Sequence, residues 1–302
     1  MRIGVSLRSA YAIDDVRMGA RWMIERAAAA RAAGLDSLFV GDHHATGVPY
    51  YQNSAILGRL LAEWGDGAAG ALYLLPLWHP VVVAEQVGTL ASVASGRFIM
   101  QCAIGGGRAQ FGAFGLSERT RPSRFEAGLD IIRRLVAGEE VTVTSGPYRV
   151  QGVRIGPRPP EPLEVWIGGH APPAIDRAAR LGDGWLAGPE VDFETARTLL
   201  AAYRKRCEVH GRIPSAVAIR RDIHVGEDDR DAERVAGPVL DRGYRGFGRG
   251  VVVTGGPDTV AVDLARFRDA GFTDVIVRHL ADDQAEVIAS FERLASVRAN
   301  LR

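Results

Sequence analysis

The sequence is poor in lysine, in cysteine and in long apolar runs. Lys205 is the only lysine among 37 basic residues, and because alanine and glycine are so abundant we attribute this to compositional bias and not to function. Cys102 and Cys207 form neither a C-x-x-C pair nor a disulfide framework, which favours a reducing, cytoplasmic setting. No run of 18 apolar residues occurs, and the sequence begins directly with strand-like RIGVSL, so we expect a soluble protein without a signal segment or a membrane span.

The charge of the chain is nearly balanced. The 37 basic and 36 acidic residues give a formal net charge of +1, which offers no electrostatic case for binding nucleic acid or an anionic membrane. With 302 residues, of which 47% are hydrophobic, the chain can bury a large core and fits one α/β barrel. We therefore expect a single domain over residues 1–302 that acts on a small molecule.

Short apolar segments alternate with helix-like segments along the chain. The expected strands are Arg2–Leu7, Ser37–Gly41, Gly70–Leu75, Arg97–Ile104, Leu163–Ile167, Gly182–Gly188, Ala216–Val225 and Thr273–Arg278. The expected helices are Arg17–Ala33, Asn53–Trp64, Pro80–Ala94, Ser123–Ala137, Pro173–Leu181, Phe193–His210, Asp258–Ala270 and Asp283–Arg298. Eight strands that are apolar enough to be buried on both faces predict a (β/α)8 barrel. A doubly wound sheet is the alternative, but the first turn, Leu7 to Ala10, lacks the glycines of a dinucleotide-binding fingerprint.

Three segments depart from this alternation. We expect residues 107–121 to form a loop, and the helix that follows to begin with a Ser-x-x-Glu capping box at Ser123 and Glu126. Residues 139–162 are typical of a β-hairpin and a proline-rich connector, which we interpret as an insertion between the fourth and fifth barrel strands. Residues 228–256 are hard to assign.

Ionisable side chains gather at the end of the second expected strand. The segment SLFVGDHH, Ser37 to His44, ends in Asp42, His43 and His44. Because imidazole titrates near neutral pH, it can move a proton or pair with a heteroaromatic ligand. A capped turn with solvated histidines is the alternative that these three residues leave open.

The carboxyl ends of the strands of such a barrel line one face, and chemistry occurs there. The residues expected at this face include Ser6, Arg8, Pro76, Gly105, Gly168, Gly169, His170, Glu190, His224, Arg278 and His279. Glycine-rich strand ends let a flat or phosphorylated ligand approach the backbone N–H groups. Packing alone also explains such glycines.

Several segments occur together in a characteristic order. They are GDHH, LLPLWHPVVVAEQVGTLASVASGRF, a glycine-rich segment with FGAFG, RFEAGLDIIRRLVAGEEV, and VWIGG followed by AIDRAARLGDGW. This set resembles the luciferase-like flavin- and deazaflavin-dependent oxidoreductases, strongly over residues 1–185 and weakly beyond. The resemblance implies a barrel with the isoalloxazine or deazaflavin ring in its mouth. Family members are often dimers, and the apolar surface of residues 53–64 permits a homodimer.

The resemblance also implies roles for single residues. Asp42 and His43 would approach the polar edge of the ring, with His43 as the proton donor or hydrogen-bond partner. Leu75 and Pro76 would lie behind the ring, in a segment that often forms a strained bulge with a non-proline cis bond in this family. Backbone contacts to the ring or to the cofactor phosphate would come from Gly105, Gly106, Gly107, Gly168, Gly169 and His170. His44 and His79 fit structural roles as well.

The choice of cofactor depends on one departure from the family pattern. FMN-using members commonly have an arginine just after the fourth strand, where this sequence has Ile104; Arg108 lies four residues further on and would reach the phosphate only along a different loop path. The chain length and the Asp-His pair also resemble members that use the deazaflavin coenzyme F420. We therefore favour F420, which transfers hydride, over FMN, whose reduced form can oxygenate a substrate with O₂.

Two further functions and the substrate stay open. A non-catalytic flavin-binding protein could keep the same site without turnover. A metal-dependent hydrolase would draw its ligands from Asp42, His43, His44, His224 and His279. The substrate would lie among the loops after strands two, four, seven and eight, and an apolar pocket with a cationic rim is indicated by Tyr50, Tyr51, Phe111, Phe114 and Arg278.

Overall fold

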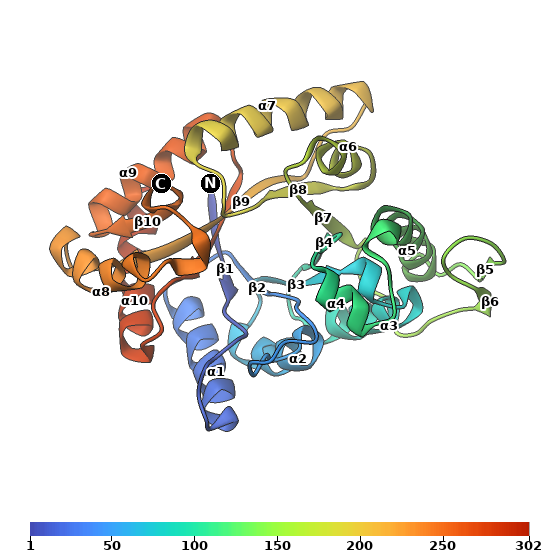
Figure 1. The fold of residues 1–302 in the computed structure, drawn as a ribbon, viewed down its shortest axis with the longest axis horizontal. Coiled ribbons are helices and arrows are strands. Elements are labelled where there is room, and N and C mark those ends of the chain that lie inside the picture. Colours follow the sequence, from blue (N-terminus) through green and yellow to red (C-terminus); the bar gives the residue numbers. More distant parts are fainter. Residues whose placement is uncertain (302) are drawn as a thin grey trace.

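The computed structural model describes residues 1–301 and contains a closed barrel of eight parallel strands (Figure 1). The barrel strands are β1 (Arg2–Leu7), β2 (Ser37–Val40), β3 (Ala68–Leu74), β4 (Phe98–Ala103), β7 (Glu164–Gly168), β8 (Gly184–Ala187), β9 (Ala216–Val225) and β11 (Asp274–His279). They pair in this order, and β11 closes the barrel against β1. The predicted (β/α)8 barrel is confirmed, and the doubly wound alternative is wrong.

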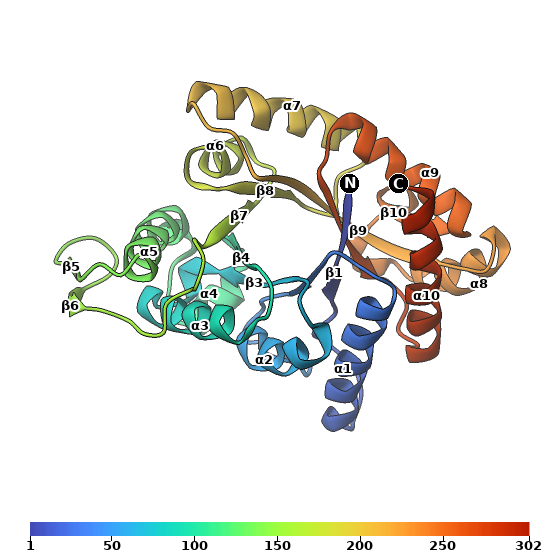
Figure 2. The same cartoon turned by 180° about the vertical axis from the view of Figure 1, so that it is seen from behind.

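Helices surround the barrel on its outside (Figures 1 and 2). They are α1 (Val16–Ala32), α2 (Asn53–Trp64), α3 (Pro80–Val93), α5 (Arg121–Val136), α6 (Pro172–Leu181), α7 (Phe193–Val209), α8 (Asp229–Asp241), α9 (Pro257–Ala270) and α10 (Gln284–Asn300). Four of them begin after an aspartate whose carboxylate accepts a backbone N–H of the first turn, which satisfies a donor that the helix itself cannot use; these caps are Asp15, Asp192, Asp228 and Asp283. Within residues 1–301, no helix is both long and apolar enough to cross a bilayer.

The predicted capping box at the start of α5 is wrong. The helix begins two residues before Ser123, because Pro122 suits a first helical turn. The Ser123 hydroxyl donates to Thr120 O at 3.1 Å from inside the helix, and no side-chain cap is made. Glu126 instead forms ion pairs with Arg177 and Arg180 of α6.

The segments that interrupt the alternation have their own structure. β5 (Val141–Val143) and β6 (Val150–Val153) pair as an antiparallel hairpin that projects beside α5, outside the barrel, between β4 and β7 in the chain (Figures 1 and 2). The expected loop after β4 contains a short helix, α4 (Arg108–Ala113). The unassigned stretch forms α8 and β10 (Val252–Gly255), and β10 pairs in parallel with the end of β9.

An apolar layer fills the inside of the barrel. The rings of Phe39 and Trp166 lie 5.5 Å apart there. The layer consists of Phe39, Ile99, Trp166, Ala216, Ala218 and Ile276. Because side chains alternate along a strand, the residues two positions after each member of this layer also point into the barrel, nearer the carboxyl ends of the strands. Any ligand site therefore lies above this layer and below the loops.

Candidate active site at the carboxyl end of the barrel

A cavity of about 270 Å³ opens at this end of the barrel. Arg220 lies two residues beyond Ala218, and Arg278 two beyond Ile276, so strand alternation brings both side chains inside. Two larger hollows lie near the amino ends of the strands, where barrels do not carry out chemistry. The cavity is lined by Ser6, Leu7, Ser9, Gly41, Asp42, His43, Tyr50, Leu72, Arg220, Arg245 and Arg278.

His43 offers its imidazole to the cavity. Within residues 1–301 its ring nitrogens make no hydrogen bond, and its ring lies 5.9 Å from the ring of Tyr50. Burial, together with the Asp42 carboxylate, raises the pKa of Tyr50 to about 12, so this phenol stays neutral and can donate a hydrogen bond at neutral pH. The hydroxyl of Tyr50 lies 3.0 Å from where a Cβ on Gly41 would be, so glycine leaves room for it.

Asp42 is buried and holds the end of β3. Its Oδ2 accepts from Leu74 N and from Trp78 Nε1, each at 2.8 Å. Its Oδ1 lies 3.0 Å from His44 Nε2, without the alignment of a hydrogen bond. The His44 N–H donates at 2.9 Å to the side chain of Gln110, which ties the loop after β2 to α4. Asp42 thus fixes the loops beside the cavity.

The glycine-rich end of β4 leaves part of its backbone open. Gly105 and Gly107 have φ angles of +64° and +98°, which favour glycine, and a Cβ on Gly107 would meet no atom within 4 Å. Gly105 O and Gly107 N–H are bound by Arg121 and Glu118 at 2.9 and 2.7 Å. Gly106 is exposed, as is Arg108, which makes no hydrogen bond within residues 1–301.

The end of β7 offers fewer free N–H groups than we expected. The Gly169 N–H donates to Leu186 O at 3.3 Å. The first two residues of α6 are prolines, which have no N–H. His170 keeps a backbone N–H that no acceptor within residues 1–301 takes, and its Nδ1 lies 2.8 Å from Glu190 Oε1. Gly168 lies beside Ala103, with 3.7 Å from its Cβ position to the Ala103 side chain.

The predicted site residues lie around one mouth, from β2 to β7. Leu74, which donates its N–H to Asp42, packs 3.4 Å from the Cβ position of Gly105. Leu75 and Pro76 are buried in a tight turn directly after β3, so they lie behind the mouth and not in the cavity wall. The peptide bonds of this turn are trans, because within residues 1–301 the cis peptide is Gly156–Pro157. The described residues therefore lack the non-proline cis bond that the resemblance led us to consider here.

Sequence reasoning missed a charged group on β9. Asp222 is fully buried and accepts from Arg220 at 3.2 Å, from Arg245 at 2.8 Å and from the Tyr244 hydroxyl at 2.8 Å. Burial alone would raise the pKa of Asp222, but the nearby guanidiniums and this hydroxyl hold it below its usual value. The signal was present in the sequence, since the charged triplet that contains Arg220 and Asp222 interrupts an otherwise apolar strand.

The expected apolar pocket is more polar than predicted. Tyr50 and Arg278 line the cavity, as expected. Phe111 belongs to α4 and is buried against Leu74 and Leu77. Tyr51 packs against α1, where its hydroxyl donates to a backbone carbonyl. Phe114 is exposed and contacts the His44 ring edge-on. Apart from Tyr50, the aromatic residues of the prediction therefore lie outside this cavity.

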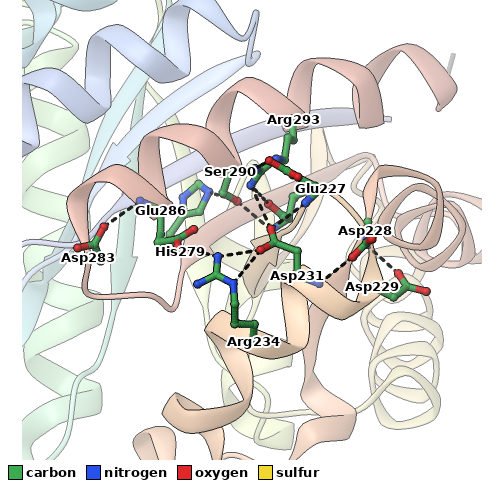
Figure 3. Close-up of polar contacts among 12 residues, drawn as sticks. Glu227, Asp228, Asp229, Asp231, Arg234, His279, Asp283, Glu286, Ser290 and Arg293 are labelled. Atoms are coloured by element: carbon green, nitrogen blue, oxygen red, sulfur yellow. Dashed lines mark hydrogen bonds and ion pairs between the residues drawn. The ribbon is translucent and has the colours of Figure 1, made fainter.

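The metal-site alternative finds no support in the geometry. His224 and His279 are buried between β9, β11 and α10, where His279 Nε2 lies 2.9 Å from the Ser290 hydroxyl (Figure 3). Within residues 1–301, no group of three or more histidine, cysteine or acidic side chains is placed to hold a metal ion.

Comparisons with known proteins place the chain in one family. The chain is 24% identical to the F420-dependent glucose-6-phosphate dehydrogenase of Nakamurella multipartita, over 94% of each chain. Its fold matches an F420-dependent secondary alcohol dehydrogenase in complex with an F420–acetone adduct, with a TM-score of 0.80, 17% identity and coverage of 100% and 99%. It also matches the FMN complex of the oxygenating constituent of 3,6-diketocamphane monooxygenase from Pseudomonas putida, with a TM-score of 0.83, 17% identity and coverage of 100% and 99%. The family described as luciferase-like monooxygenase matches residues 1–274. This chain therefore belongs to the luciferase-like monooxygenase family.

Proposed function

We propose that the protein is an F420-dependent oxidoreductase that transfers hydride between the deazaflavin and a small organic substrate. The observation that carries the proposal is the cavity at the carboxyl ends of the strands, where His43 presents an imidazole whose nitrogens make no hydrogen bond within residues 1–301. The full-length similarity to an F420-dependent dehydrogenase supports the same cofactor. The mouth is also the place where barrels of this architecture carry out their chemistry.

The open backbone around the mouth fits a flat ring with a phosphorylated tail. Gly105, Gly106 and Gly107 would pass beside the ring, since a side chain is missing where the backbone is open. The free N–H of His170 and the exposed guanidinium of Arg108 would serve the tail. Gly168 and Gly169 would leave room beside them, and Leu75 and Pro76 would support the ring from behind. The bound cofactor would supply the hydride.

His43 and Asp42 have different tasks in this proposal. His43 holds or donates a proton at the substrate oxygen as hydride is transferred, because it lines the cavity and within residues 1–301 its ring nitrogens make no hydrogen bond. Asp42 is a positioning residue, since its Oδ2 accepts hydrogen bonds from Leu74 and Trp78. The neutral phenol of Tyr50 can donate a hydrogen bond to the same substrate.

Use of FMN with O₂ is the second candidate function. It is favoured by the structural similarity to an FMN-binding monooxygenase. Against it, Ile104 occupies the position where FMN-using relatives commonly carry an arginine, and Arg108 projects from α4. A flavin-binding protein without turnover is the remaining alternative.

Calorimetric titration of the purified protein with F420 and with FMN tests the cofactor. We expect F420 to bind and FMN to bind more weakly. Binding of FMN alone would transfer the proposal to the monooxygenase, and binding of neither would remove both functions. F420 binding without turnover on a panel of alcohols, sugar phosphates and carboxylic acids would leave the non-catalytic alternative.

Replacing His43 tests the mechanism. His43→Ala should lower turnover by about 10²–10⁴-fold, the usual contribution of a positioned proton donor, while F420 binding weakens far less. His79→Ala is the matched control, because His79 is exposed and packs on Tyr148 of the insertion hairpin, away from the cavity. Equal turnover in His43→Ala and wild type would remove His43 from the mechanism.

The assembly and the location of the protein belong to the same proposal. We propose a cytoplasmic enzyme that forms a homodimer. The large apolar side chains of α2 are buried in the core, so the dimer surface must involve other residues as well; these buried side chains are Leu57, Leu60, Leu61 and Trp64. Light scattering on the protein eluting from a size-exclusion column distinguishes a dimer from a monomer.

A further inference from the structure

Positive charge is concentrated on one side of the cavity. Arg220 and Arg245 share a single carboxylate, Asp222, at 3.2 and 2.8 Å. Arg278 comes from β11, the neighbour of β9, and lines the same cavity. We call these four residues the cavity cluster. It holds three guanidiniums and one carboxylate, so cations exceed anions on this wall.

Arg278 is the cation without a protein partner. Within residues 1–301 it makes neither an ion pair nor a hydrogen bond, although it is half-buried at the cavity wall. Holding a partly desolvated charge unpaired costs stability, so such groups are normally matched by a carboxylate. A planar guanidinium offers paired donors that suit the two oxygens of a carboxylate or phosphate.

Arg245 reaches the cavity from a strained backbone. Its φ angle is +50°, which is unusual and unfavourable for a residue with a side chain. Two glycines of the same turn, Gly243 and Gly246, also have positive φ angles, +82° and +72°. The turn places the Arg245 guanidinium against Asp222, at the side of the cavity where Arg278 lies.

We propose that the cavity binds an anionic group of the substrate, a carboxylate or a phosphate ester, with Arg278 as its direct partner and Arg220 and Arg245 flanking it. The cavity volume of about 270 Å³ suits a small molecule. Asp42, the acidic residue that lines the cavity after β2, repels an anion and so favours its binding toward β9 and β11. This inference deepens the proposed function, since it names the substrate class of the same site.

The test measures anion binding to the protein without F420, so it does not depend on the proposed reaction. Inorganic phosphate and acetate are titrated calorimetrically at constant ionic strength. We expect millimolar binding of at least one anion, and Arg278→Met should weaken it about tenfold or more, as loss of a hydrogen bond between charged groups requires. Arg234→Met is the matched control, because it removes an arginine on α8 that does not line the cavity.

Each outcome decides the proposal. Binding of phosphate alone indicates a phosphate ester, and binding of acetate alone indicates a carboxylate. Absence of binding for both, or equal binding by Arg278→Met and wild type, overturns the inference. If Arg278→Met does not fold, Arg278→Lys answers the question, since it keeps the charge but loses the paired donors and should bind more weakly than wild type. Anion binding by a protein that fails to bind F420 would contradict the proposed function and leave this inference standing.

Discussion

Two charged clusters of this protein differ in how their charges are matched. The first is the cavity cluster described above. The second, the α8–α10 network, joins the start of α8 to α10 on the outside of the barrel (Figure 3). Arg234 lies between Asp231 and Glu286, at 2.7 and 2.9 Å. Arg293 contacts Asp231 and Glu227, at 3.8 and 3.3 Å.

The comparison separates charge that holds the fold from charge that faces a ligand. In the α8–α10 network two guanidiniums meet three carboxylates, and the contacts join two helices that pack beside β9. In the cavity cluster, Arg220 and Arg245 both pair with Asp222, and within residues 1–301 Arg278 forms no ion pair. Burial lowers the pKa of Arg220 to about 10, so this side chain remains a cation at neutral pH. The unmatched charge lies where a ligand can enter.

The largest expected effect comes from removing Asp222. Asp222→Asn leaves Arg220 and Arg245 without their carboxylate, and breaking a buried ion pair in this way costs about 3–5 kcal/mol of unfolding free energy. Urea unfolding measures the loss. Asp231→Asn is the control from the network. Because Arg234, its nearest partner, is mostly exposed, we expect a much smaller change.

The same variant, Asp222→Asn, should also change anion binding in the cavity. Asp222→Asn increases the excess of positive charge, so the folded fraction should bind phosphate or acetate more tightly than wild type. Equal losses of stability in Asp222→Asn and Asp231→Asn would remove the distinction between the two clusters.

The next largest effect is a loss of stability at acid pH, which comes from two buried histidines on β9 and β11. His224 and His279 are buried, and desolvation lowers the pKa of both imidazoles, with Arg26 adding to the shift at His279. The folded state therefore binds fewer protons than the unfolded chain below pH about 6.5, and the protein loses about 1.4 kcal/mol per pH unit for each such histidine until its folded pKa is reached. Above pH about 6.5 both states leave these histidines unprotonated, and this contribution to stability is fully present.

A single replacement checks the sign and the source of this slope. Within residues 1–301, neither ring nitrogen of His224 has a hydrogen-bond partner, so His224→Leu loses no such bond. Urea unfolding at several pH values should show a shallower acid slope for this variant than for wild type. An unchanged slope would place the acid sensitivity in other groups.

Much of the fold could be predicted from the sequence, because the barrel depends on apolar periodicity. All eight barrel strands were expected within a few residues of their observed bounds. The exceptions have local causes. α4 is only six residues long and contains Gly112, and α8 contains Gly237 and Pro238, so neither has a clear helical pattern. The capping box was misplaced because Pro122 begins α5 earlier.

The site was predictable only where side chains follow strand ends directly. His43 and Arg278 were expected at the mouth and line the cavity. Arg220 sits inside a strand that was interpreted as apolar, so its inward direction followed only from the register of the barrel. Arg245 could not be found, because a turn with positive φ angles at Gly243, Arg245 and Gly246 brings it to the cavity from far along the chain.

The smallest expected effect comes from the α8–α10 network itself. Arg234 is mostly exposed, and solvent and salt screen its contacts to Asp231 and Glu286, so Arg234→Met should shift the melting temperature by only about one degree. Scanning calorimetry at low and high salt measures this shift, which should vanish at high salt. Anion binding should be unchanged, because the side chain does not line the cavity. A large drop in the melting temperature would mean that the paired charges of the α8–α10 network stabilise the barrel as strongly as Asp222 does. The two clusters would then differ in ligand binding alone.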